Sequence, residues 1–340
     1  MDFLYHVGIF LLEAVIIVAA VAAIAVIVVA AGMKSRQKAG GLQITDLSSQ
    51  YRRMSDQITE ELMAKEERKA HQKAVKAKLK QEKKQSKSDE NKLFVIDFKG
   101  SIDAKEVRSL REEVTAILSV AKLTDEVLIR LESGGGMVHG YGLAASQLAR
   151  IREANIPLTV AVDKVAASGG YMMACIANKI LAAPFAIVGS IGVVAQLPNF
   201  NKLLKKNDID YEQITAGKYK RTLTVFGENT EEAREKFRQE LEETHQLFKG
   251  FVHQYRPELD VDKVATGEHW FGQQALEKGL IDAMTTSDDY LMKHYQHMQV
   301  VNVHYQSKKT LSEKLGKAVS MGVDRSFSRL LNQGKWDWMR

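Results

Sequence analysis

The sequence has few cysteines and prolines and no histidine pattern typical of a metal site, and each of these shortages argues against one structural feature. Its single cysteine, Cys175, rules out an intramolecular disulfide, and the surrounding apolar run MMACIA predicts a buried, unreactive thiol. Four prolines in 340 residues argue against long proline-rich linkers. The nine histidines include no HExxH or paired-ligand spacing, so we expect no metal and no cofactor.

The positive net charge of the chain comes from one segment, and the rest lacks an excess of Lys and Arg. The net charge is +6, but residues 34–92 hold sixteen Lys and Arg against nine Asp and Glu, which leaves the rest at −1. This near-neutral remainder gives no reason to expect a nucleic-acid partner. The same segment is rich in Ala, Glu, Lys and Gln, which predicts a solvated helical stalk or partial disorder. Binding of anionic lipid headgroups is the other interpretation.

Charged residues are also absent from Ala14 to Met33, a run made almost wholly of Ala, Val and Ile. About 20 such residues span a hydrocarbon core of ~30 Å. The N-terminus MDFLYH has neither Lys nor Arg, and the apolar run is too long for a cleaved signal peptide. We therefore expect a retained transmembrane anchor in residues 1–33, with the lipid bilayer as a partner. The Lys and Arg that follow favour a cytoplasmic location for the rest of the chain.

The pattern changes at Leu93, where β-branched runs begin to alternate with helical patterns. LFVIDF, VLIRL and LTVAV are typical of strands, and helical patterns follow the first two at residues 104–120 and 141–154. Such alternation predicts an α/β fold with a mainly parallel sheet covered by helices. Asn229, with Glu232 three residues later, predicts the capped start of a further long helix.

Two segments could place reactive groups at the ends of these strands. Glu132–Gly136 follows one predicted strand, and its glycines let backbone N–H groups approach a ligand, as an oxyanion hole or phosphate site requires. A plain glycine-rich turn fits the same residues. Ser168 follows a strand and precedes a helix that begins at about Gly169. That position suits a nucleophile and equally suits a helix N-cap.

A base for such a serine is not obvious. No histidine lies between Ser168 and His245, and the position of His245 does not suggest a Ser–His–Asp triad. A lysine can replace histidine where desolvation keeps its amine neutral. Lys220 in ITAGKYKR, after a predicted strand and a glycine, is a candidate. Lys218 and Arg221 flank it, and composition alone does not choose among the three, since a solvated surface charge fits each.

Five ordered blocks of the sequence resemble one family. SGGG, AASGGYMMA, VGSIGVV, AGKYK and GEHWFGQQALEKGLID are similar to the signal peptide peptidase A (protease IV) family of bacterial inner-membrane peptidases, over about Leu93 to Ala283. The predicted anchor and stalk resemble its SohB branch. The resemblance implies a Clp protease/crotonase-like fold, in which stacked ββα units form a spiral, mainly parallel sheet. It also implies a homo-oligomeric ring or dome, in which serine and lysine can come from different subunits.

The resemblance also implies roles for particular residues. They are Ser168 as nucleophile, Lys220 as general base, Ser190 as the residue that orients the lysine amine, and the backbone N–H groups of Gly135 or Gly136 and of Gly169 as the oxyanion hole. The chain departs from the family pattern at Gly134, where proline is common, and lacks the proline often found after Lys220. The first departure loosens the turn without removing its N–H groups.

From the sequence we expect a membrane-anchored serine endopeptidase of the bacterial inner membrane. Its expected substrates are signal-peptide remnants or other unfolded, membrane-proximal polypeptides. Its expected parts are the anchor at 1–33, the stalk at 34–92, the peptidase domain at 93–300 and a basic tail at 301–340. The alternatives are a catalytically silent scaffold of the same fold and a crotonase-like acyl-CoA enzyme that uses Glu132. The resemblance favours a periplasmic catalytic domain, against the charge rule, and we lean to that side.

Overall fold

The structure, a computed structural model, describes residues 40–84 and 90–306. The chain divides into two units, of which residues 42–304 form one and the two terminal segments form the other. The terminal unit lies almost entirely outside the described residues. The fold is therefore that of residues 42–304, together with the few described residues that complete the first and last strands. Within the described ranges, no helix combines the length and apolar character needed to cross a membrane.

Two of the predicted parts lie wholly or largely outside the described residues. These are the anchor at 1–33 and the basic tail, of which only residues 301–306 are described, as the end of strand β10 (Gln299–Gln306). Strand β2 (Lys92–Lys99) begins where the stalk was expected to give way to the peptidase domain. The division of the chain into four parts stays a prediction.

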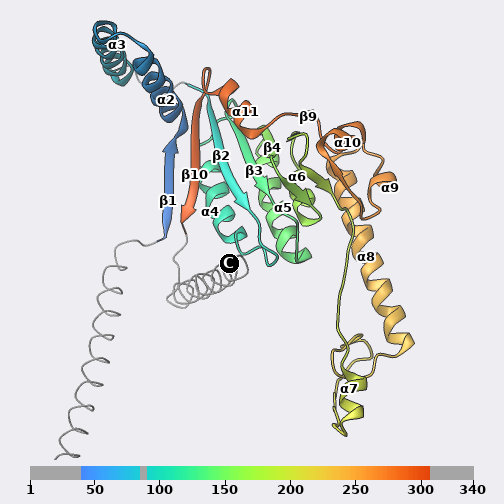
Figure 1. The fold of residues 1–340 in the computed structure, drawn as a ribbon. Helices are drawn as coiled ribbons and strands as arrows, with labels where there is room; N and C mark the ends of the chain where they lie inside the picture. Colours follow the sequence, from blue (N-terminus) through green and yellow to red (C-terminus); the bar gives the residue numbers. More distant parts are fainter. Residues whose placement is uncertain (1–39, 85–89, 307–340) are drawn as a thin grey trace, which may run out of the picture. The chain divides into compact units, whose positions relative to one another are not determined.

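A sheet of seven strands forms the centre of the fold (Figure 1). In spatial order the strands are β1 (Gly41–Asp46), β10, β2, β3 (Glu126–Glu132), β4 (Leu158–Val162), β6 (Lys179–Ala182) and β9 (Ala283–Met284). Every neighbouring pair from β10 to β9 is parallel. All five residues of β4, LTVAV, are buried, as expected for a strand covered on both faces. The predicted α/β fold with a mainly parallel sheet is confirmed.

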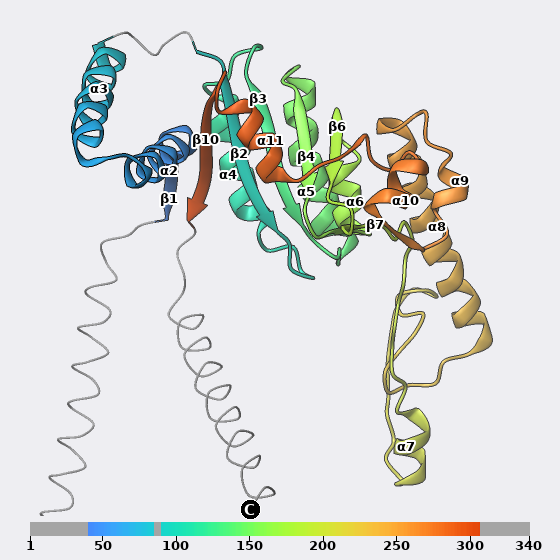
Figure 2. The same cartoon turned by 45° about the horizontal axis from the view of Figure 1, so that its top comes forward.

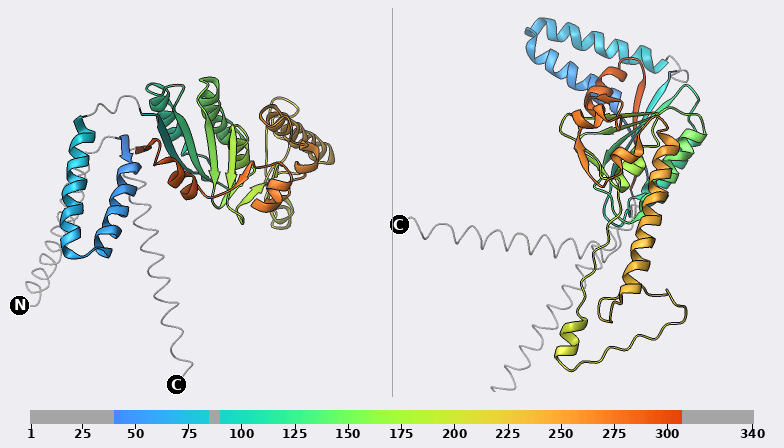
Figure 3. Two further views of the ribbon diagram at one scale, coloured as in Figure 1. Left: turned by 90° about the horizontal axis from the view of Figure 1, so that it is seen from above. Right: turned by 90° about the vertical axis from the view of Figure 1, so that its right-hand side faces the viewer.

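Helices cover both faces of this sheet (Figure 3). The helices that bury side chains against the first face are α4 (Val107–Leu118), α5 (Val138–Glu153), α6 (Gly169–Ala174) and α8 (Glu231–Tyr255). Alternate residues of a strand point to opposite faces, so Phe94 and Ile96 join this core. Leu93 and Val95 join a second core with Leu291 of α11 (Ser287–His294).

The cysteine that the sequence placed in an apolar run lies in the first core. Cys175 is fully buried, and its Sγ lies 3.3 Å from the carbonyl oxygen of Met172. Burial raises the pKa of the Cys175 thiol far above its ordinary value, so the thiolate does not form at physiological pH. The predicted buried, unreactive thiol is confirmed.

A second, smaller sheet carries the residues of interest at its edge. It consists of β5 (Val165–Ala167), β7 (Ile187–Gly189) and β8 (His269–Phe271), with β5 and β7 parallel and β8 antiparallel to β7. A bridge between Ser133 and Ala166 connects β5 to the residue that follows β3. The carboxyl ends of β3, β5 and β7 therefore meet at one place.

The remaining described helices are α2 (Leu47–Leu62), α3 (Lys65–Lys84), α7 (Asn201–Lys206), α9 (Val261–Val264) and α10 (Gly272–Glu277). Of these, α9 and α10 bury side chains in the first core, and α2 packs against the second. The basic stalk segment thus contains two helices. Asp46 caps the first by accepting from the Ser49 N–H over 2.9 Å. Arg68 of the second lies within ion-pair distance of Glu60 and Glu61 of the first.

Residues 193–230, here called the arm, connect β7 to α8, and no residue of the arm is buried (Figure 2). Ring contacts of Phe200 and Tyr211 with Phe226 give it local order. The helix cap predicted at Asn229 is wrong by one residue. Thr230 caps α8 by accepting from the backbone N–H of the third helical residue. The Asn229 side chain instead holds the arm, accepting from a backbone N–H five residues before it.

Candidate active site

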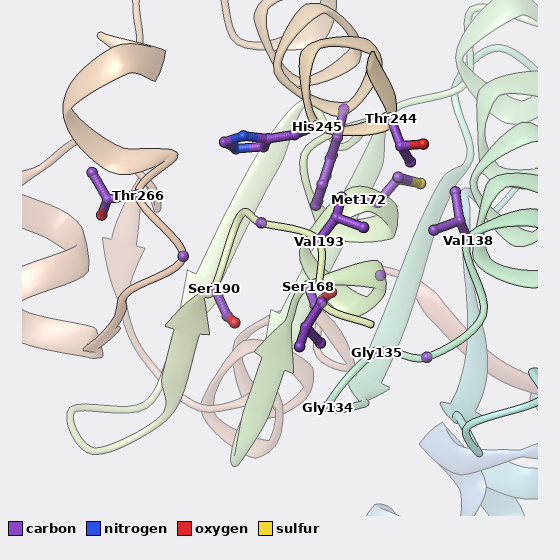
Figure 4. A pocket seen from close by; sticks show the side chains of 16 residues that line it. Gly134, Gly135, Val138, Ser168, Met172, Ser190, Val193, Thr244, His245 and Thr266 are labelled. Carbon is purple, nitrogen blue, oxygen red and sulfur yellow. The ribbon is translucent and has the colours of Figure 1, made fainter. Parts of the chain in front are cut away.

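Ser168 and Ser190 lie at the same edge because the strands before them are paired (Figure 4). Strands β5 and β7 are parallel, with Ala167 opposite Gly189, so the next residue of each strand reaches the same end. The Ser168 N–H donates to the Gly189 carbonyl oxygen over 2.8 Å and fixes this arrangement. The two predicted serines are therefore brought together by strand register.

Both serines have a backbone conformation that residues with side chains rarely adopt. Each has a φ of 51°, and Ser168 combines it with a ψ of −118°. Ser168 occupies the N-cap position of α6, but its side chain makes no capping hydrogen bond. The simple N-cap interpretation therefore does not explain this serine. Such strain costs about 1–3 kcal/mol and is concentrated at functional sites.

The glycine turn, Gly134–Gly136, packs directly against Ser168. Gly135 has a φ of +88°, and a Cβ atom built on it would lie 2.8 Å from the Ser168 Cβ and 2.7 Å from the Gly169 nitrogen. Only a residue without a side chain allows this approach. The turn that the sequence singled out is thus held in contact with the predicted nucleophile.

Among the backbone N–H groups here that have no acceptor among the described residues are those of Gly134 and Gly136 in the turn and of Gly169, the first residue of α6. The Gly135 N–H, in contrast, donates to the Ser133 Oγ over 3.1 Å. The sequence left open whether Gly135 or Gly136 supplies an oxyanion donor. The hydrogen bonding favours Gly136, because its N–H is available to a ligand.

The glycine turn and the two serines line a pocket of about 590 Å³ (Figure 4). Apolar side chains form much of its wall, among them Met172 of α6, Val193 at the start of the arm and Phe248 of α8. Among the described residues, no Asp, Glu, Lys or Arg lines the pocket. A pocket of this chemistry accepts an apolar or neutral side chain next to the Ser168 hydroxyl.

His245 also lines this pocket, which the sequence did not predict. Its Nε2 atom is buried without a hydrogen-bond partner. In Figure 4 the ring is turned towards the side of the Thr266 turn rather than towards Ser168. The helical spacing could have revealed this position, because His245 precedes Phe248 by three residues on the face of α8 that packs on the core.

Lys220 does not lie in this pocket. It is exposed in the arm, which has no strand before it, so the strand predicted ahead of Lys220 is wrong. The flanking Lys218 forms an ion pair with Glu232 at 2.6 Å. Hydrogen bonding to Glu232 and Tyr219 raises the pKa of Lys218 above its ordinary value, which disfavours Lys218 as a base.

Nearly the whole sequence matches two models of one protein family. Residues 2–148 match the N-terminal part of peptidase family S49, and residues 150–301 match peptidase family S49 itself. The chain belongs to peptidase family S49.

Relatives in this family include a probable protease SohB from Haemophilus influenzae, 49% identical over 349 residues, covering 99% of this chain and 99% of the relative. A probable protease SohB from Buchnera aphidicola subsp. Schlechtendalia chinensis is 53% identical over 303 residues, covering 86% and 99%. Among solved structures, the 1510-N membrane-bound stomatin-specific protease with a substrate peptide is similar over 68% of this chain and 98% of that one. Its TM-score is 0.41 and its sequence identity is 15%.

Membership in peptidase family S49 confirms the expectation that the chain is a protease. Glu132, the residue on which the acyl-CoA alternative depended, forms surface ion pairs with Lys99 at 3.0 Å and Lys164 at 3.2 Å. Hydrogen bonds from these lysines lower the pKa of Glu132, so it stays ionised and paired. It does not line the pocket. The geometry therefore gives Glu132 a structural role beside the site.

Proposed function

We propose that this member of peptidase family S49 is a membrane-anchored serine endopeptidase, with Ser168 as nucleophile and Lys220 as general base. One observation carries the assignment of Ser168. Its hydroxyl lies on a strained turn at a pocket edge, in contact with the glycine turn, and the N–H groups of Gly136 and Gly169 there have no acceptor among the described residues. This is the arrangement that acyl transfer to a serine requires.

In the proposed reaction, the Ser168 Oγ attacks the carbonyl carbon of the scissile peptide bond and its proton passes to the neutral Lys220 Nζ. The N–H groups of Gly136 and Gly169 donate to the negative oxygen of the tetrahedral intermediate. The Lys220 ammonium then protonates the leaving amine, which breaks the C–N bond and leaves an acyl-enzyme. Finally, Lys220 takes a proton from water as the water oxygen attacks the ester carbonyl, and the ammonium then returns a proton to the Ser168 Oγ as the ester C–O bond breaks. Ser190 orients the lysine amine.

The exposed position of Lys220 suggests how the dyad forms. A lysine serves as a general base where its amine is removed from water, so Lys220 has to be covered before it can act. The arm also exposes large apolar side chains, including Ile214 at 94% and Val194 at 80% of their surface. We propose that a second copy of the chain covers the arm and that Lys220 completes the site across that interface, in a ring or dome.

Complementation tests this arrangement. Chains carrying Ser168→Ala and chains carrying Lys220→Ala are each inactive, and co-expressed they regain part of the wild-type activity. A doubly substituted chain mixed with wild type is the control for simple dilution. No recovery in the mixed sample would contradict a dyad formed between subunits.

The proposed substrates are unfolded polypeptides near the membrane, such as signal-peptide remnants, with an apolar or neutral side chain in the pocket. The uncharged pocket wall supports this preference. The anchor at 1–33, the stalk at 34–92, the peptidase domain at 93–300 and the tail at 301–340 complete the proposed organisation. The succession of short strands and helices supports stacked ββα units of the Clp protease/crotonase type. A C-terminal reporter active on one side of the inner membrane tests the proposed periplasmic location.

Labelling with a fluorophosphonate probe tests the nucleophile. Wild-type protein is expected to be labelled at Ser168, and Ser168→Ala is expected to abolish labelling and hydrolysis while the protein stays folded. Lys220→Ala is expected to reduce both strongly. Ser146→Ala, an exposed helical serine, is the control and retains both activities. A label that persists in Ser168→Ala would contradict the proposed function.

His245 is a second candidate for the base, because it shares the pocket with Ser168 and its Nε2 lacks a partner. The two bases are distinguished by substitution. If Lys220 is the base, His245→Gln retains most of the maximal rate and Lys220→Ala loses it. The reverse result would assign the proton transfer to His245.

A further inference from the structure

A buried hydrogen-bond chain lies behind the glycine turn, away from the pocket. The hydroxyl groups of Ser133 and Tyr141 lie 2.6 Å apart, and both residues are almost completely buried. The Tyr141 hydroxyl donates to the Ser101 carbonyl oxygen over 2.9 Å, and the Gly135 N–H donates to the Ser133 Oγ over 3.1 Å. Tyrosine has one hydroxyl proton, so Ser133 must donate to Tyr141. The chain therefore runs in one direction from Gly135 to Ser101.

The ring of the same tyrosine packs against the other side of the site. A Cβ atom built on Gly169 would lie 2.7 Å from the Cδ2 atom of Tyr141, so the ring packs directly against this glycine. Tyr141 comes from α5, while Gly169 begins α6 and Ser133 follows β3. A single side chain thus packs against Gly169 directly and reaches the glycine turn through the Ser133 hydroxyl.

We propose that Tyr141, acting through Ser133, is a positioning residue that sets the oxyanion hole, its hydroxyl holding the glycine turn and its ring holding Gly169. The inference rests on the proposed function, since it concerns how the N–H groups of Gly136 and Gly169 are aimed. Tyr141 does not line the pocket and touches no substrate.

The glycine turn needs such a restraint. Its residues lack side chains, and nothing lies within 4 Å of a Cβ atom built on Gly134, so packing does not hold that end. At the other end, the Met137 N–H donates to the Ile102 carbonyl oxygen over 2.8 Å. Between these points, the hydrogen bond from the Gly135 N–H to Ser133 fixes the plane of the Gly134–Gly135 peptide. Without it, this peptide loses its orientation, and the next peptide, which carries the Gly136 N–H, can shift with it.

The restraint does not depend on pH over the working range of the enzyme. Burial raises the pKa of the Tyr141 hydroxyl above its ordinary value, although the hydrogen bond with Ser133 opposes this. The hydroxyl therefore stays protonated and keeps donating to Ser101. A loss of rate caused by its removal is expected to be equal at every pH, unlike the loss of a proton-transfer group.

The test compares Tyr141→Phe with wild type in the full chain. The substitution keeps the ring against Gly169 and deletes only the hydroxyl. We expect kcat to fall about tenfold with KM within twofold, because Ser133 loses the hydrogen-bond partner that orients its hydroxyl towards the turn, whereas substrate binding is unaffected. The affinity of a peptide boronate, whose tetrahedral adduct with Ser168 occupies the oxyanion hole, is expected to fall by the same factor. Ser133→Ala should match these effects, and Ser133→Thr should retain near-wild-type values.

Controls separate this role from a loss of stability and from failure of the proposed function. Tyr290 is a second tyrosine with a bonded hydroxyl, near Thr159 and Glu126, and Tyr290→Phe should leave kcat unchanged. The Tyr141→Phe/Ser133→Ala pair should lose no more than either single variant, since both break one chain. Normal Ser168 labelling with unchanged kcat and boronate affinity in Tyr141→Phe would overturn the inference alone. Absence of Ser168 labelling in wild type would overturn the proposed function and the inference with it.

Discussion

The pocket edge around Ser168 and the arm that carries Lys220 differ in how completely one chain builds them. At the pocket edge, strand pairing, the glycine turn and a buried hydrogen-bond chain fix the backbone on every side. In the arm, no residue is buried and large apolar side chains face outward. In the proposed function, the nucleophile side is therefore preformed within the chain, whereas the base side depends on a surface that a second copy would provide.

The largest expected effect tests the arm. Lys220→Ala should reduce kcat/KM for a peptide substrate about 10³-fold, the range expected for a general base. Lys218→Ala, two residues away and paired with Glu232, should change it less than about threefold. Both side chains are exposed, so neither substitution should move the unfolding temperature appreciably. Equal losses in the two variants would show that the arm acts by charge alone and not through one amine.

The next effect tests the pocket edge. Gly135→Ala should lower kcat about 10²-fold and reduce stability, because its Cβ atom would collide with Ser168 and Gly169 at a backbone of positive φ. Gly134→Ala is the matched control, since its Cβ atom would meet nothing within 4 Å. Steady-state kinetics and thermal unfolding of both variants provide the measurement. Unchanged activity and stability in Gly135→Ala would mean that the turn is not preformed.

An ion pair at the end of α8, outside the pocket edge, and one in the arm extend the comparison to stability. Arg256 donates to both carboxylate oxygens of Asp282 at 2.8 and 2.9 Å, and these side chains are only 14% and 32% exposed. Lys205 and Glu228 of the arm are 63% and 71% exposed. Arg256→Ala should cost about 3 kcal/mol of unfolding free energy, because it leaves a half-buried carboxylate unpaired. Lys205→Ala should cost less than about 0.5 kcal/mol. Urea denaturation of both variants checks the difference.

The same buried pair predicts a pH dependence. Burial acts to raise the pKa of Asp282, but hydrogen bonds from Arg256 and from the Ile180 N–H outweigh it and hold the value below 3.8. A carboxyl group with a lowered folded-state pKa stabilises the fold above its unfolded pKa, and this contribution is lost as the pH falls through the folded value. The difference in unfolding temperature between wild type and Asp282→Asn should therefore shrink below about pH 4. A difference that is constant from pH 7 to pH 3 would contradict the pairing.

The contrast between buried and exposed segments also explains which strands could be predicted from the sequence. Strands β2, β3 and β4 were predictable because each is a long apolar run buried on both faces. The three-residue strands of the second sheet were not, since so short a run has no period to detect. The strand predicted before Lys220 failed for a related reason. Ile214 has the right propensity, but it is 94% exposed and has no sheet to join.

The candidate site was predictable where backbone chemistry determines it. Consecutive glycines and a serine between a strand and a helix pointed to the correct turns. The position of His245 in the pocket was not predicted, because the sequence of α8 is rich in charged residues. Only the packing of α8 on the core shows which face of this helix lines the pocket. The proposed roles of Tyr141 and Ser133 could not be predicted from the sequence. Their contact joins residues eight apart in the chain, and the turn that brings them together is seen only in the fold.

The smallest expected effect concerns backbone strain at Ser168. Ser168→Gly should abolish activity yet raise the unfolding free energy by about 1 kcal/mol, because glycine adopts a φ of 51° and a ψ of −118° without steric cost. Ser168→Ala keeps a side chain at the same dihedral angles and should gain nothing. In the arm, Asp208 also has a positive φ, but aspartate tolerates it and the surroundings are exposed, so Asp208→Gly should gain less than half as much. If Ser168→Gly is no more stable than Ser168→Ala, the pocket edge stores no strain, and rigid packing alone separates it from the arm.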